Sequence, residues 1–216
     1  MIRSNSIALA IGLALATTAC SNPADGKPQA KVEEATPQDK AAAATPAAKA
    51  GGYTVNAASS TLGFVGSKVT GSHPGGFKTF SATVDPKDGK VEGGSVSVEI
   101  EIDSMFSDSE KLTGHLKSAD FFDAEGHPKA TFQSSEIKAG GDDGHSHTVV
   151  GNLALHGVTK KITFPATIAM DGGTVTVKSE FSINRKDFEM AYAGKADDLI
   201  RDEVVIKLDL TFDGIA

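Results

Sequence analysis

The sequence predicts an all-β domain, an eight-stranded antiparallel barrel with a short helical insertion. From residue 53 onward, apolar and polar residues alternate in successive runs, which is the period of strands with one dry and one wet face. Short turns rich in Gly and Asp separate these runs, so neighbouring strands are expected to pair antiparallel. Eight strands that close on themselves form a barrel that is filled by side chains or holds one small ligand.

The alternation is clearest in SVSVEIEID, where Val96, Val98, Ile100 and Ile102 share one face and polar residues the other. Pro165 cannot donate to a strand ladder, so we expect a bulge or a local opening there. The other expected strands cover residues 61–69, 77–84, 129–138, 148–157, 161–170, 174–183 and 205–213.

One helical stretch, SDSEKLTGHLKS at residues 107–118, interrupts the strands. Ser107 precedes Glu110 by three residues, which is the spacing of a capping box. Leu112 and Leu116 fall one turn apart on one face. We expect this element and the turn after it to cover one end of the barrel, with an apolar floor of Leu116, Phe121 and Phe122.

Residues 1–19 have the features of a lipoprotein signal peptide. Arg3 gives a positive start, and the apolar run that follows is too short to span a bilayer, which needs about 20 residues. LATTAC resembles the bacterial lipoprotein cleavage box, in which the cysteine, here Cys20, becomes the acylated first residue. Thr17 stands where Leu is usual, so ordinary secretion is the alternative. In a Gram-negative host, Ser21 after the cysteine implies the outer membrane and a periplasm-facing protein.

Residues 20–52 are expected to form a lipid-anchored, disordered linker between this anchor and the barrel domain at 53–216. The segment contains no aromatic residue, and Val32 is its only larger aliphatic residue. Such a composition buries too little apolar surface to offset the entropy of ordering the chain.

Three separated motifs in the barrel domain are similar to those of a known family. HLKSADFFDAEGHPKATFQSS, GNLALHGVTKKITFP and FSINRKDF resemble the YceI-like family of lipid-binding periplasmic proteins, over about residues 53–212. The resemblance implies a lipocalin-like barrel that holds a polyisoprenoid chain in its lumen. It also carries two interpretations of Arg185, either a contact with a polar head group or an ion pair with Asp187 that pins the end of the strand.

Other kinds of site have weaker support in the sequence. The formal net charge of −7 argues against nucleic acid as a partner. No nucleophile elbow is present, and the only cysteine is Cys20. One group of metal-binding residue types lacks the spacing of a compact ligand motif: His115, Asp120, Asp123, Glu125 and His127. In the other group, Asp142, Asp143, His145 and His147, the His-x-His pair would place both rings on one face of a strand, which suits a surface metal, whereas DDG is also typical of a solvated hairpin turn. We expect no functional metal site and no cofactor.

The sequence therefore predicts a non-enzymatic protein that sequesters an isoprenoid lipid, either a polyprenol or a quinone. Inward Gly151, Ala166 and Ser179 are small, which favours a cavity over a packed core. The alternatives are an enzyme acting on a small substrate through His115, His156, Arg185 and Asp187, or an interaction protein with a filled barrel; a homodimer also stays open. The expected ligand-binding residues are Val96, Val98, Ile100, Ile102, Leu116, Phe121, Phe122, Leu153, Leu155, Phe164, Phe181, Leu208 and Leu210.

Overall fold

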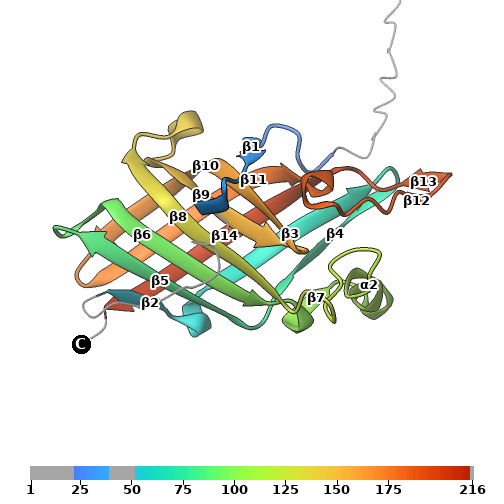
Figure 1. Ribbon diagram of the computed structural model, residues 1–216, viewed down its shortest axis with the longest axis horizontal. Coiled ribbons are helices and arrows are strands. Elements are labelled where there is room, and N and C mark those ends of the chain that lie inside the picture. The colour runs from blue at the N-terminus through green and yellow to red at the C-terminus, as the bar shows by residue number, and fades with distance from the viewer. Residues whose placement is uncertain (1–21, 39–51, 215–216) are drawn as a thin grey trace, which may run out of the picture.

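The structure, a computed structural model, describes residues 22–38 and 52–214 (Figure 1). Cys20, the expected signal peptide and the second part of the expected linker lie outside the described residues. The long strands are β3 (Thr61–Lys68), β4 (Gly71–Phe77), β5 (Phe80–Lys87), β6 (Lys90–Glu101), β8 (Lys129–Ala139), β9 (His147–Leu155), β10 (Val158–Asp171), β11 (Thr174–Asn184) and β14 (Glu203–Gly214). The short ones are β1 (Lys31–Glu34), β2 (Tyr53–Val55), β7 (Met105–Ser107), β12 (Gly194–Lys195) and β13 (Asp198–Leu199), and the helix is α2 (Glu110–Leu116).

Eight strands form a closed antiparallel barrel, as the sequence predicts. Hydrogen bonds link β2, β5, β6, β8, β9, β10, β11 and β14 in that order, and β14 returns to β2. β3 pairs with the first half of β14 and carries β4 and β7 beside it. Because β2 and β3 share β14, the first strand of the barrel domain is split into two pieces.

The strands are long, and their alternation gives the barrel an apolar interior. β10 has 14 residues, and β6 and β14 have 12 each, which corresponds to a length of about 40 Å or more at about 3.3 Å per residue. Figure 1 accordingly shows an elongated barrel, with α2 and the β12–β13 hairpin at one end and the β5–β6 turn at the other. Buried Val84, Val91 and Val175 pack the end that carries the β5–β6 turn.

The wall has an opening at Pro165, as expected from its missing N–H group. β10 and β11 pair only from Thr167 to Asp171 on β10, and Pro165 lies just before this ladder. The hydroxyl group of Ser179 donates a hydrogen bond to the Pro165 carbonyl at 2.5 Å, which satisfies that acceptor without a strand partner. Upstream of Pro165 the two strands separate.

Residues 28–34, which we call the N-terminal strap, fill this separation. β1 pairs antiparallel with Lys160–Thr163 of β10. On the other side, the Ala30 N–H donates to the Ser182 carbonyl at 2.8 Å, and the Ser182 N–H donates to the Pro28 carbonyl at 2.9 Å. The prediction of a disordered linker over 20–52 is therefore wrong for this part, because local composition does not reveal that an open strand edge is available to pair with it.

The helix lies where the sequence predicts it, but its cap differs. α2 begins at Glu110 and the side chain of Ser109, not Ser107, accepts the hydrogen bond of the Leu112 N–H at 3.4 Å. Ser107 instead ends β7, where its hydroxyl group contacts the Ser109 carbonyl and Thr113 Oγ1 at 2.9 Å. Among the described residues, no helix is both long and apolar enough to cross a membrane.

Candidate functional site: an apolar cavity in the barrel

The barrel encloses a cavity of about 370 Å³. Its wall is built from alternate side chains of the barrel strands, together with Leu112 and Leu116 of α2 and the Phe121–Phe122 pair after it. The volume falls within the range of small-molecule sites, about 300–1,000 Å³. The interior is therefore hollow and almost entirely apolar.

Twelve of the thirteen expected ligand-binding residues line this cavity. Ile102 does not; it is only 1% exposed and lies in the short 3-10 helix Ile102–Ser104, packed into the core. The prediction for Ile102 is wrong because β6 ends at Glu101, so the strand alternation does not reach it. The residues that line the cavity as expected are Val96, Val98, Ile100, Leu116, Phe121, Phe122, Leu153, Leu155, Phe164, Phe181, Leu208 and Leu210.

Several lining residues keep accessible surface although they point inward. Val96, Ile100, Leu153 and Leu208 are only partly buried, because they face open space in the lumen and not another side chain. The small residues were expected to create this space, but Gly151, Ala166 and Ser179 do not line the cavity. A side chain at Gly151 would meet the ring of Phe132 at 2.4 Å, so the missing side chain makes room for a phenylalanine.

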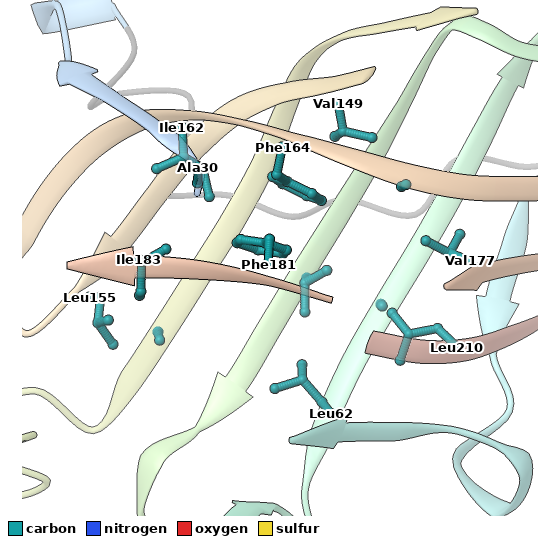
Figure 2. Close-up of a cluster of buried hydrophobic side chains, with 14 of the residues drawn as sticks. Ala30, Leu62, Val149, Leu155, Ile162, Phe164, Val177, Phe181, Ile183 and Leu210 are labelled. Carbon is teal, nitrogen blue, oxygen red and sulfur yellow. The ribbon is translucent and has the colours of Figure 1, made fainter. Parts of the chain in front are cut away.

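Aromatic rings organise the lumen in two groups. Phe164 stacks on Phe181 with ring centroids 4.3 Å apart (Figure 2), and Phe132 lies 5.7 Å from Phe164. Phe64 and Phe77 approach Phe122 at 6.4 and 6.2 Å, which ties the turn after α2 to β3 and β4. Offset and tilted rings at these distances present continuous apolar surface to a ligand.

The polar lining residues gather at one end of the cavity, which we call the polar end. They come from the end of β3, the start of β4, the turn after β11 and the segment just before β14. Hydrogen bonds connect these segments: the Arg201 N–H donates to the Ser67 carbonyl at 2.9 Å, and Arg185 Nε donates to the Arg201 carbonyl at 3.2 Å. The polar end consists of Ser67, Lys68, His73, Arg185 and Arg201.

Arg185 has a structural partner, although not the expected one. Its side chain is 4% exposed, and its guanidinium group donates to Asp202 at 3.1 Å and to the carbonyl of Met190. The expected pairing with Asp187 is wrong, because Asp202 at the start of the last strand lies opposite the turn. Sequence spacing favoured the nearer aspartate, whereas the fold brings together residues 17 positions apart.

The two groups of candidate metal ligands do not converge. His115 Nε2 is 2.9 Å from Asp120 Oδ2, and the His115 ring packs against Phe121. His147 is buried and its Nε2 lies 3.5 Å from Glu92, whereas His145 Nδ1 lies 2.9 Å from the Asp142 carbonyl. In the described part of the chain, no three His, Cys, Asp or Glu side chains are grouped to hold a metal ion.

The four residues of the enzyme alternative are also dispersed. Of His115, His156, Arg185 and Asp187, only Arg185 lines the cavity. His156 occupies the β9–β10 turn, where its Nδ1 lies 3.0 Å from the Phe188 carbonyl. The geometry therefore favours binding by apolar surface over chemistry at the mouth.

Comparison with known proteins identifies relatives of the barrel domain. Residues 53–212 match the family described as YceI-like domain. A UPF0312 protein of Pseudomonas putida is 37% identical over 98 residues, 45% of this chain and 50% of that protein, so the chain spans about half the length of this curated relative. A UPF0312 protein of Pseudomonas syringae is 29% identical over 147 residues, 65% of this chain and 72% of that protein.

Solved structures share the fold. The crystal structure of BcnA from Burkholderia cenocepacia is 30% identical, with a TM-score of 0.61 over 73% of this chain and 98% of that one. A domain from Saccharophagus degradans, described as polyisoprenoid binding, is 18% identical, with a TM-score of 0.60 over 76% of this chain and 98% of that one.

Proposed function

Since the chain belongs to the YceI-like domain family, we propose that it binds a long isoprenoid lipid inside its barrel and keeps it from water. The single observation that carries this proposal is the hollow apolar lumen, whose volume is about 370 Å³. A barrel filled by its own side chains, as an interaction protein would have, offers no such space. The polyisoprenoid-binding description of a neighbour with the same fold supports the class of ligand.

Apolar contact alone supplies sufficient affinity for this role. A chain of about 40 carbons, at about 0.3 kcal/mol per heavy atom, gains on the order of 12 kcal/mol, which corresponds to nanomolar binding. No charged or catalytic group is needed to hold the chain. We therefore assign the protein a binding and not a catalytic role, with a polyprenol or an isoprenoid quinone as ligand.

The sequence at the N-terminus extends the proposal to the location of the protein. Cys20 in a lipoprotein-like cleavage box supports a tether to the outer membrane, with the barrel facing the periplasm. Two or more acyl chains anchor a protein stably, whereas one does so only marginally. A permanently anchored carrier suits storage, handover or protection of a lipid near one membrane better than free shuttling.

Filling the lumen tests the proposal. Leu208 faces the cavity and is only partly buried, so Leu208→Trp should place a large ring in the open space. The full chain is produced in a bacterium that makes isoprenoid lipids, and the purified protein is extracted with organic solvent for mass spectrometry. We expect the wild type to carry isoprenoid lipid and Leu208→Trp to carry at least about tenfold less, a loss of about 1.4 kcal/mol in binding.

Asp209→Trp is the matched control, because Asp209 is the next residue on β14 and is exposed on the outer face. It should retain the wild-type amount of lipid. A wild-type protein that is free of lipid, or a Leu208→Trp protein that carries as much lipid as the control, would overturn the proposal.

A further inference from the structure

Two polar groups at the polar end of the cavity are buried and unpartnered. Ser67 is 6% exposed, and its hydroxyl oxygen makes no hydrogen bond to any described residue. The same is true of the buried Nε of Arg201. Both residues line the cavity. A buried donor without a partner costs about 1–3 kcal/mol. A ligand that placed an acceptor oxygen beside Ser67 and Arg201 would remove this cost.

The other polar side chains of this end that could carry a positive charge already have carboxylate partners. Lys68 donates a hydrogen bond to Asp198 Oδ2, and this bond, followed by that from Thr70, lowers the pKa of Asp198. His73 Nδ1 lies 3.0 Å from Asp108, and Arg185 pairs with Asp202 at 3.1 Å. Arg201, in contrast, forms no ion pair with a carboxylate of the described residues. Its positive charge is the one that the surrounding groups leave uncompensated.

We propose that Arg201 and Ser67 form a head-group site, which receives an acceptor oxygen of a lipid whose chain fills the lumen. This inference rests on the proposed function and narrows the preferred ligand to lipids with an oxygen-bearing head, which should bind more tightly than a bare hydrocarbon of the same chain. The guanidinium group supplies N–H donors and a charge, and the hydroxyl group supplies one further donor. Because that charge lacks an anion in the protein, an anionic head group is held more tightly than a neutral one.

The backbone keeps the two groups together. The Arg201 N–H donates to the Ser67 carbonyl at 2.9 Å, and Lys68 forms an isolated antiparallel bridge with Ile200. The Arg201 carbonyl is in turn held by Arg185 Nε at 3.2 Å. Buried Arg185 is therefore a positioning residue, because it orients the segment that carries Arg201.

Three lipids that share one saturated C20 isoprenoid chain and differ only in their head test this site: phytanyl phosphate, phytanol and phytane. Binding to the delipidated full chain is measured for the wild type, Arg201→Met and Ser67→Ala. Arg201→Met removes every donor but keeps an apolar side chain of similar length, and Ser67→Ala removes only the hydroxyl group. We expect Arg201→Met to lower the affinity for the phosphate at least about tenfold, and Ser67→Ala to lower it about threefold or more.

The alcohol should lose less affinity than the phosphate in Arg201→Met, and phytane binding should change less than about twofold in both variants. Lys90→Met is the control for loss of a positive charge, because Lys90 is exposed at the opposite end of the barrel. It should bind all three lipids as the wild type does. Equal losses for the alcohol and the phosphate would identify a neutral acceptor and overturn the preference for an anionic head.

The failure of this site and the failure of lipid binding give different results. One result would reject the head-group site and keep lipid binding in the apolar cavity. In it, all three lipids bind the wild type, and neither variant changes the affinity for the phosphate relative to the affinity for phytane. If none of the lipids binds the wild type, the proposed function itself fails. Should Arg201→Met not fold, the Ser67→Ala ratio of phosphate to phytane decides the question alone.

Discussion

At the scale of single residues, the polar end depends on one buried guanidinium group. Arg185 is 4% exposed and donates to three partners, of which two are main-chain carbonyls. These carbonyls belong to Arg201 and Met190, which lie on different segments. Arg185 therefore joins the turn after β11 to the start of β14 as well as pairing with Asp202.

We expect Arg185→Met to lower the free energy of unfolding by about 2–4 kcal/mol, because two carbonyls lose a buried donor and the Asp202 carboxylate loses one of its two donors. Urea unfolding followed by circular dichroism measures this change. Lys186→Met is the matched control, since Lys186 also pairs with Asp202, at 2.8 Å, but is 52% exposed. It should cost less than about 1 kcal/mol, and equal losses in the two variants would contradict the structural role of Arg185.

The sequence predicts inward residues well and polar contacts poorly. Strand alternation places Leu153, Phe164 and Leu208 in the cavity correctly, because the side-chain period along a strand is fixed. It fails at Ile102, where the strand has ended. The sequence does not indicate Arg201, because no local pattern marks it. Its position depends on a hydrogen bond from its N–H to the carbonyl of Ser67, which is distant in the sequence.

At the scale of elements, the N-terminal strap completes the barrel wall. It pairs with β10 on one side and with Ser182 of β11 on the other, where those strands have separated upstream of Pro165. Ala30 is 5% exposed and belongs to the same buried apolar cluster as Ile162 and Phe164 (Figure 2). Lys27 adds an ion pair with Glu180 at 2.9 Å, which together with Lys207 lowers the pKa of Glu180.

We expect Ala30→Asp to detach the strap while the barrel stays folded, because an unpaired carboxylate in an apolar cluster costs several kcal/mol. Hydrogen exchange followed by mass spectrometry should show the amides of residues 29–34 and Ser182 exchanging at least about tenfold faster. The strands β6 and β8, which do not pair with the strap, should keep their protection. Ala58→Asp, at an exposed position, is the control and should change nothing.

Hydrogen exchange of Ala30→Asp has one outcome that would contradict pairing between the N-terminal strap and the barrel wall. If Ser182 exchanges at the wild-type rate in Ala30→Asp, residues 28–34 do not pair with the wall in solution. The sequence could not have predicted this element, since its polar composition is typical of a linker. What orders it is the edge exposed by Pro165, and the two segments are more than a hundred positions apart along the chain.

At the scale of the whole molecule, closure of the barrel explains how an apolar lumen stays open beside the packed part of the core. Each strand of the ring has a partner on both sides, so the wall keeps its shape although the interior is not filled. The fold class and the antiparallel order of its long strands follow from alternation and turns. The split first strand and the extra β4 and β7 do not, because they depend on which part of β14 each strand reaches.

A crystal structure of the full chain saturated with geranylgeranyl phosphate would show whether a lipid chain lies inside this lumen. We expect continuous tubular density along Phe132, Phe164 and Phe181, ending in a head group beside Arg201. A lumen closed by its own side chains, or a lipid bound only on the outer surface, would contradict this expectation.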